Sequence, residues 1–221
     1  MSTKGCTKVS TKRKEVRRDL GEDRRELAHK LIEVGAVSPH VADPSLQFPL
    51  NLRTPDDPCP GPLTPEIVDL AARCMHKILK ALGPVDAIVG IPPAGEPFAR
   101  AIAMLPPRTL HIVPEIWEDG GRKHIVSLGR TPILVITKVL LVDALLEEGG
   151  LMCETVRVLR DARIEVADAM VVVDRGMGGS KELAKLGCHL HPIFTASELL
   201  ELCAESNRIS NQPPGGFHPR P

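Results

Sequence analysis

The stretch of sequence that decides the fold joins an apolar run, an acidic residue and a pair of glycines: Val139-Leu140-Leu141-Val142-Asp143-Ala144-Leu145-Leu146-Glu147-Glu148-Gly149-Gly150. A helical pattern over residues 151–163 follows directly. This order predicts a buried strand that ends at the acid, then a short loop, then a helix N-terminus. Such an N-terminus favours a phosphate group through its free N–H groups and its dipole. Open parallel sheets bind ligands at this edge. The stretch therefore predicts a phosphosugar-binding loop, in which the two glutamates are unexpected.

Strands and helices alternate along the rest of the chain. Apolar runs predict strands at residues 85–89, 110–113, 139–142, 170–173 and 188–194. Helical spacing predicts helices at residues 24–34, 65–82, 98–104, 151–163 and from 195 onward. Continuous apolar strands separated by helices are typical of a parallel sheet buried on both faces. We therefore expect an α/β fold.

Several local signals fix the ends of these elements. Thr64-Pro65-Glu66 has the hydroxyl, proline and acid that open a helix, and Thr195 with Glu198 forms a capping box. Gly35 and Gly83 are expected to end the helices before them. An acidic, glycine-containing turn at 118–122 predicts a hairpin with residues 124–128. Residues 133–136 fit either an additional strand or an extension of the next one.

The chain divides into three parts by composition. Residues 1–23 form a basic arm expected to be disordered, residues 24–205 form the domain, and residues 206–221 form a disordered tail. Nine basic residues stand against four acidic ones in the first 25 positions. A polyanion-binding role for this arm is the alternative to a solvated arm, which we favour because no DNA-binding motif accompanies it.

Composition excludes several classes of protein. A hydrophobic content of 43% with 28 basic and 28 acidic residues is typical of a globular, cytoplasmic protein. Aromatic residues make up 2%, which requires an aliphatic core and argues against binding of single-stranded nucleic acid. No apolar stretch reaches the roughly 20 residues of a membrane span, and no signal-peptide pattern is present. The six cysteines are expected as reduced thiols. No metal site is expected, because Cys74 with His76 and Cys188 with His191 lack zinc-finger spacing.

The stretch at 139–150 resembles the phosphoribosyl pyrophosphate (PRPP) motif of type I phosphoribosyltransferases. Other segments narrow the resemblance to the orotate phosphoribosyltransferase family: Asn51-Leu52-Arg53, Gly90-Ile91-Pro92, Gly95-Glu96-Pro97, Asp174-Arg175-Gly176-Met177-Gly178-Gly179 and Thr195-Ala196-Ser197-Glu198-Leu199-Leu200. The match keeps its order from about residue 27 to residue 203. The resemblance implies a parallel sheet flanked by helices, a small N-terminal hood and a homodimer. The apolar side of the helix at 65–82 is a candidate for the dimer face.

The resemblance also implies where a ligand binds. The phosphate and ribose would lie against Asp143, Glu147, Glu148, Gly149, Gly150 and Leu151. The orotate pocket would include Arg175, Pro93 and Ala94. Possible pyrophosphate contacts are Arg122, Lys123 and His124, the basic residues nearest to the family's catalytic loop, although we favour the alternative that they decorate a solvated hairpin. Mg²⁺ would enter with PRPP, which together with water holds most of the metal in this family.

The chain departs from the family pattern where the chemistry takes place. The paired acids of the motif become Asp143-Ala144, and its hydroxyl pair becomes Glu147-Glu148. Residues 113–119, which match the position of the family's basic catalytic loop, contain no basic residue. The family's Lys-Ser-Gly segment is missing from residues 38–50. Two like charges 4 Å apart repel by about 4 kcal/mol at an effective dielectric constant near 20, so the glutamates are expected to oppose a bound phosphate.

Two functions remain open. The first is a weakly active or non-catalytic relative that binds a pyrimidine or nucleotide. The alternative is an active Mg²⁺-dependent enzyme that makes orotidine 5′-monophosphate and pyrophosphate from orotate and PRPP. The departures favour the first function, whereas the family resemblance favours the second.

Overall fold

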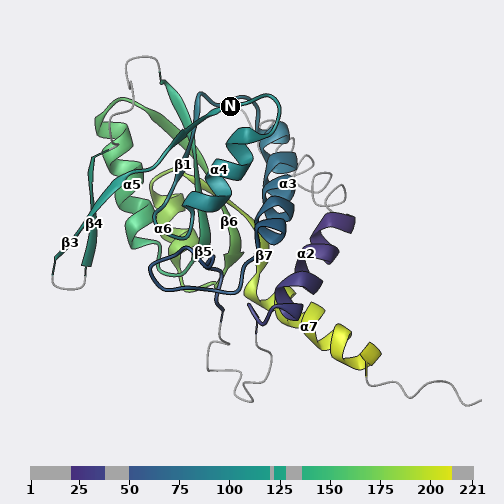
Figure 1. The fold of residues 1–221 in the computed structure, drawn as a ribbon. Helices are drawn as coiled ribbons and strands as arrows, with labels where there is room; N and C mark the ends of the chain where they lie inside the picture. The colour runs from purple at the N-terminus through teal and green to yellow at the C-terminus, as the bar shows by residue number, and fades with distance from the viewer. Residues whose placement is uncertain (1–20, 38–49, 120–121, 128–135, 211–221) are drawn as a thin grey trace, which may run out of the picture.

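A five-stranded parallel sheet forms the centre of the protein (Figure 1). The computed structural model describes residues 21–37, 50–119, 122–127 and 136–210. The strand order is β2-β1-β5-β6-β7. The strands are β1 (Ala87–Gly90), β2 (Leu110–Ile112), β5 (Lys138–Leu146), β6 (Glu165–Asp174) and β7 (His189–Thr195).

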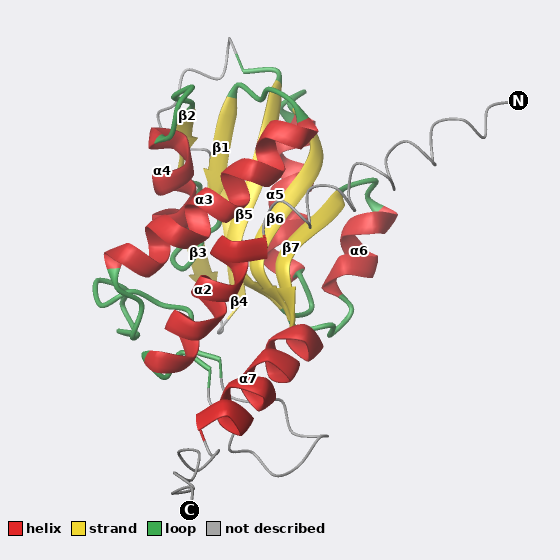
Figure 2. Ribbon diagram, turned by 90° about the vertical axis from the view of Figure 1, so that its right-hand side faces the viewer, coloured by secondary structure: helices red, strands yellow, loops and turns green. Residues whose placement is uncertain are grey.

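Helices cover both faces of the sheet (Figure 2). On one face lie α3 (Pro65–Leu82) and α4 (Glu96–Met104). On the other face lie α5 (Gly150–Asp161) and α6 (Gly179–Lys185). These three layers confirm the α/β fold class expected from the alternation of strands and helices.

Two more helices pack beside the first layer. The N-terminal helix α2 (Gly21–Glu33) contacts α3 and the C-terminal helix α7 (Ala196–Ser210). Val37 and Leu50 form an isolated antiparallel bridge after α2. No helix among the described residues is long and apolar enough to cross a membrane.

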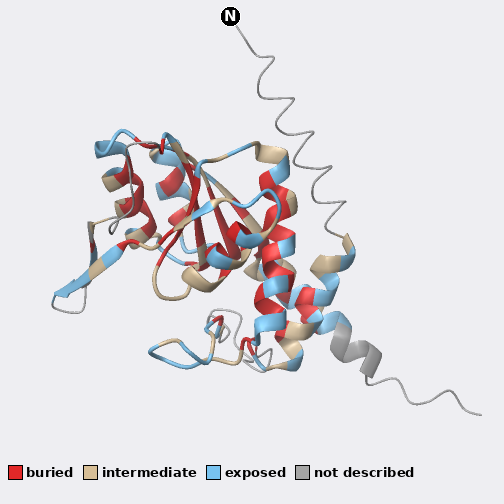
Figure 3. Cartoon of the chain, turned by 45° about the horizontal axis from the view of Figure 1, so that its top comes forward, coloured by how far each residue is buried: buried red, intermediate tan, exposed pale blue. Residues whose placement is uncertain are grey.

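Two apolar clusters, one on each face of the sheet, form the core (Figure 3). Nearly all of their members are aliphatic, and Phe98 and Phe194 are the fully buried aromatic residues among the described positions. The central strand β5 contributes to both clusters, through Leu140 and Val142 on one face and Val139 and Leu141 on the other. The expected aliphatic core is therefore confirmed.

The helix ends follow the local sequence signals. The Thr64 hydroxyl accepts a hydrogen bond from the Ile67 N–H at 3.4 Å, with proline at the first helical position. In the capping box of α7, the Thr195 N–H donates to Glu198 at 2.9 Å and the Glu198 N–H donates to Thr195 Oγ1 at 3.3 Å. Gly35 and Gly83 both follow helices with positive φ. These predicted caps are confirmed.

Some boundaries differ from those expected. β5 continues to Leu146, because it pairs with the longer β6 as far as Asp174. α2 begins at Gly21 rather than at residue 24. α7 continues to Ser210, because neither proline nor glycine interrupts the chain between its start and Pro213. Residues 1–20 and 211–221, most of the expected arm and tail, lie outside the described residues. So do residues 133–135 of the unassigned stretch.

The apolar side of α3 does not form an exposed face. Its residues, including Leu70, Met75 and Ile78, are buried in the core, where α3 packs on α2, α4 and β7. The expectation that this side supplies a dimer face is therefore wrong, because intramolecular packing already covers it. The homodimer itself stays a prediction.

Arg24 joins the two ends of the described chain. Its Nε donates to the Ile193 carbonyl at 2.9 Å, and its guanidinium lies 2.8 Å from the Glu198 carboxylate. The guanidinium also lies 4.9 Å from the centre of the Phe194 ring, a cation–π distance. Since this side chain links α2 to β7 and to the start of α7, we expect it to contribute measurably to stability.

Replacing Arg24 with Met should lower the free energy of unfolding by about 1–3 kcal/mol, because a partly buried carbonyl and a carboxylate lose their donor. Arg25→Met removes the same charge from an exposed neighbouring position and should change stability by less than about 0.5 kcal/mol. Urea denaturation of both variants measures the difference. Equal losses would contradict a specific role for Arg24.

Candidate functional site

Three neighbouring strands end at one edge of the sheet and bring their loops together. The loops follow β1, β5 and β6, which are adjacent in the strand order. A cavity of about 440 Å³ opens at the β5 loop. Its lining consists of Asp143, Leu145, Leu146, Glu147, Glu148, Gly149, Gly150, Leu151, Met152 and Met177. All six expected phosphate and ribose candidates therefore line one cavity.

The loop after β1 is held against β5 by a close backbone approach. The Ile91 N–H donates to the Val142 carbonyl at 2.9 Å, and the Gly95 N–H donates to the Ile91 carbonyl at 2.8 Å. A Cβ on Gly95 would lie 2.4 Å from the Val142 oxygen, so no side chain fits there. The Gly95 of the family-like segment is thus required for packing.

The loop after β6 approaches the β5 loop in the same way. The Gly179 N–H donates to the Glu147 carbonyl at 2.9 Å. A Cβ on Gly179 would lie 2.6 Å from that same oxygen. Gly149, which precedes α5, has φ of 78° and makes no side-chain cap. The glycines at 149 and 179 therefore let two loops meet at the N-terminus of α5.

An ion pair crosses between these two loops. Arg175 Nη1 lies 2.5 Å from Glu147 Oε1. The arginine side chain is 14% exposed and the glutamate side chain 47% exposed. Glu147 is therefore neutralised by an internal partner, so the repulsion expected from two free glutamates applies in full only to Glu148. Arg175, a candidate for the orotate pocket, contacts the lining of the cavity instead of belonging to it.

The two residues at the centre of the motif face different surroundings. Asp143 lies half-buried in the cavity lining, and its Oδ1 accepts from the Ala144 N–H at 2.7 Å. Burial raises the pKa of Asp143 from its ordinary 3.8 to about 7, against the backbone N–H groups of Ala144 and Leu145. Ala144 is buried in the core with Val142. Of the two motif positions, Asp143 is thus a weaker acid than an ordinary aspartate, and Ala144 lies in the apolar core.

The first strand of the hairpin before β5 carries acidic residues at the position that matches the family's basic catalytic loop. β3 (Glu115–Asp119) pairs antiparallel with β4 (Arg122–Ser127), which confirms the expected hairpin. His124 Nδ1 lies 3.3 Å from Glu154 Oε1 of α5, and His124 does not line the cavity. The side chains of Arg122 and Lys123 lie outside the described residues. Their expected pyrophosphate contacts stay a prediction.

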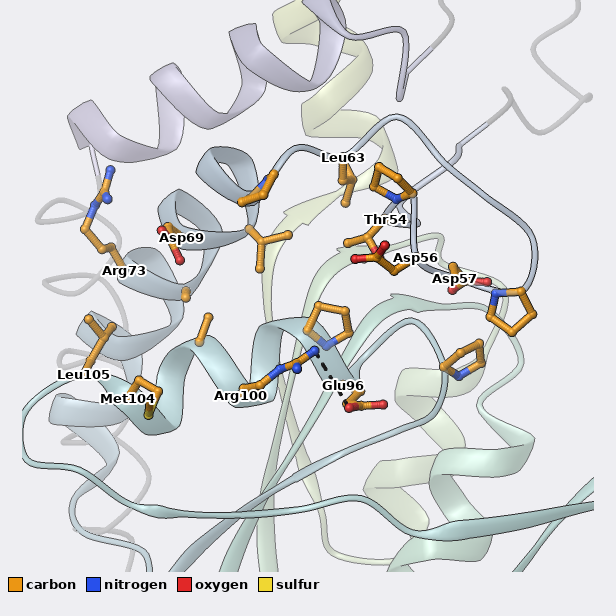
Figure 4. Close-up of a pocket in the computed structure, with 18 residues that line it drawn as sticks. Thr54, Asp56, Asp57, Leu63, Asp69, Arg73, Glu96, Arg100, Met104 and Leu105 are labelled. Carbon is orange, nitrogen blue, oxygen red and sulfur yellow. Dashed lines mark ion pairs between the residues drawn. The ribbon is translucent and has the colours of Figure 1, made fainter.

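A second, larger cavity lies between α3 and α4, where Pro93 contributes to the lining (Figure 4). Its volume is about 900 Å³. Two of its lining residues, Glu96 and Arg100, lie one turn apart on α4, and their carboxylate and guanidinium groups are 3.9 Å apart. Ala94 is half-buried and packs on the core. The expected orotate candidates are thus divided: Pro93 lines the α3–α4 cavity, whereas Arg175 adjoins the β5 cavity. The sequence pattern missed the α3–α4 cavity, because segments distant in sequence enclose it.

The possible metal-binding pairs serve other roles. Cys74 and His76 are buried on α3, and Cys188 is buried beside β7. His191 Nε2 lies 2.7 Å from Asp168 Oδ1, near the start of β6. In the part of the chain that the structure describes, no group of three or more His, Cys, Asp or Glu is arranged to hold a metal ion.

Changing Gly179 to Ala should lower the free energy of unfolding by about 2 kcal/mol or more, because the new Cβ would collide with the Glu147 carbonyl. Gly150→Ala is a matched control at the start of the neighbouring helix α5, since nothing lies within 4 Å of a Cβ there. Alanine also favours the helix that begins at this residue. Thermal unfolding of both variants tests the difference. A stable Gly179→Ala protein would refute the close approach.

The raised pKa of Asp143 predicts a pH dependence of stability. A carboxyl group with a higher pKa in the folded state binds more protons when folded, so stability falls as pH rises from about 4 to about 7. Above that range the contribution is constant. Asp143→Asn should remove this part of the pH dependence. The free energies of unfolding of both proteins, measured from pH 4 to pH 8, give the difference, and parallel curves would show that Asp143 keeps an ordinary pKa.

Comparisons with known proteins agree with this architecture. No family model matches the chain. The orotate phosphoribosyltransferase of Saccharolobus solfataricus is 28% identical over 177 residues, which cover 80% of each chain. UMP synthase of Leishmania donovani has a similar structure, with a TM-score of 0.62 and 26% identity, over 83% of this chain and 38% of that longer protein.

A further solved structure supports the fold alone. The orotate phosphoribosyltransferase of Mycobacterium tuberculosis in complex with inorganic phosphate is 22% identical and has a TM-score of 0.62. The match covers 84% of this chain and 95% of that one. The chain is therefore similar in sequence to orotate phosphoribosyltransferases, and it has the α/β fold of type I phosphoribosyltransferases.

Proposed function

We propose that this protein binds a pyrimidine or a pyrimidine nucleotide and has little or no phosphoribosyltransferase activity. The observation that carries the proposal is the ion pair between Glu147 and Arg175. It places a carboxylate of the protein in the loop that would receive a ligand's phosphate, and it occupies the arginine that resembles the family's orotate contact. An enzyme that bound PRPP tightly would need this loop open to an anion.

The residues around Asp143 give the proposal further support. The family resemblance implies two neighbouring acids that hold the ribose hydroxyls. Here burial raises the pKa of Asp143 to about 7. An acidic side chain at position 144 would enter the apolar core, where an unpaired charge is strongly unfavourable. A simple reversal of Ala144 to Asp would therefore not restore the ribose contact.

The first strand of the hairpin, β3, carries no cation that could assist a leaving pyrophosphate. In β3, Glu115, Glu118 and Asp119 are exposed. Glu115 accepts a hydrogen bond from the Ser127 hydroxyl at 2.6 Å. Stabilisation of developing negative charge by preorganised donors is usually the largest single contribution to catalysis. Acidic side chains at this position would oppose the reaction.

The alternative is an active Mg²⁺-dependent orotate phosphoribosyltransferase, favoured by the sequence identity to proteins of that name. In that case Mg²⁺ would be carried largely by PRPP and water, as the family resemblance implies. A homodimer is part of both proposals, because the resemblance implies loops shared between neighbouring sites.

An assay with orotate, PRPP and Mg²⁺ tests the proposal. We expect no measurable turnover, because the loss of one charge-stabilising donor typically lowers the rate by about 10²–10³-fold and several are missing. Replacing both Glu147 and Glu148 with Thr should not restore turnover, although it should raise affinity for orotidine 5′-monophosphate. Calorimetry with orotate supplies the binding measurement. Turnover of about 10 per second, typical of enzymes in general, would establish the alternative.

A further inference from the structure

Among the residues that the structure describes, the side chains that line the β5 cavity include acidic ones and no basic one. Asp143, Glu147 and Glu148 are its ionisable members, and the remaining lining residues are glycine, leucine or methionine. The guanidinium of Arg175 contacts this lining through its ion pair with Glu147. An anionic ligand that enters this cavity would bind the guanidinium of Arg175, and the carboxylate of Glu147 already occupies that position.

Arg175 is held in place on its backbone side. Its N–H donates to the Leu146 carbonyl at 2.9 Å, and the preceding Asp174 accepts from the Gly176 N–H at 2.9 Å. The arginine side chain is largely buried. Its planar guanidinium matches the geometry of a carboxylate. Arg175 is therefore a fixed binding point for a flat, singly charged carboxylate.

The backbone of Glu147 is held by a hydrogen bond, whereas its side chain is partly open to solvent. The backbone carbonyl accepts from the Gly179 N–H at 2.9 Å, whereas nearly half of the side chain is exposed. Its carboxylate can leave Arg175 for solvent by side-chain rotation, with the loop unchanged. An exchange of one carboxylate for another would then leave the charge around Arg175 as it was.

We propose that Glu147 is a specificity-determining residue that competes with the ligand for Arg175. The inference rests on the proposed pyrimidine-binding function and names the ligand group that the site selects. A ligand carboxylate replaces the Glu147 carboxylate, which moves into solvent. A phosphate dianion would bring additional negative charge toward Asp143 and Glu148, and the site selects against it.

The test compares two ligands and two matched variants. Orotate carries a carboxylate, and uracil is the same ring without it. Glu147→Gln removes the competing charge and can still accept a hydrogen bond from Arg175. Glu148→Gln removes the same charge one residue away, from an exposed side chain that lines the same cavity. Circular dichroism and thermal unfolding confirm that each variant folds, and calorimetry measures binding at low and at high salt.

We expect Glu147→Gln to bind orotate about tenfold more tightly than the wild type, because the ligand carboxylate then displaces a neutral amide from Arg175 instead of a charged carboxylate. Uracil affinity should change by less than about twofold. Glu148→Gln should change orotate affinity by less than about threefold, and this effect should vanish at high salt because exposed charges are screened. The orotate-specific gain distinguishes competition from a structural role of Glu147.

Two failures have different meanings. If wild type and Glu147→Gln bind orotate equally, or both variants give the same gain, the competition is refuted and the proposed binding function stands. If no pyrimidine binds to any of the three proteins, the competition and the proposed function both fall.

Discussion

The pairing of β5 with β1 on one side and β6 on the other is the interaction on which the remaining structure depends. β5 is the central strand, and its apolar residues contribute to the clusters on both faces of the sheet. Its register with β6 extends to the pair Leu146 and Asp174, and this extension determines where both following loops begin. Every described residue of the β5 cavity lies in or near the strand end that this pairing positions.

Close backbone contacts at glycines turn this strand pairing into a cavity. Gly95 packs on the Val142 carbonyl and Gly179 on the Glu147 carbonyl, so the loops after β1 and β6 both touch β5. These contacts explain why family-like glycines are retained although the acids and hydroxyls of the motif have changed. The glycines serve the packing of the fold, whereas the changed residues concern the ligand. A scaffold of this type can therefore persist with a different function.

The electrostatics of the site follow from the same geometry. The contact between the β5 and β6 loops brings Glu147 against Arg175, and burial raises the pKa of Asp143 in the adjoining cavity. The site has three acids: Asp143 with a raised pKa, Glu147 paired with Arg175, and the exposed Glu148. This arrangement differs from the one expected for a site that binds a phosphosugar. The ligand that we propose for it is one whose anionic group can replace the carboxylate of Glu147.

The sequence by itself determined the order of strands and helices, the aliphatic core, the helix caps and the family resemblance. These features depend on hydrophobic periodicity and on residues within a few positions of one another, such as Thr195 with Glu198. It also predicted that residues 143–151 line a ligand site at the sheet edge. Tertiary structure decided the length of β5, the burial of the α3 side once expected at a dimer interface, and the separation of Pro93 from Arg175. It also decided the charge state of the site, because Glu147 and Arg175 are 28 residues apart and meet through the pairing of β5 with β6. A contact between such distant residues depends on strand register and loop packing, and these leave no local pattern in the sequence.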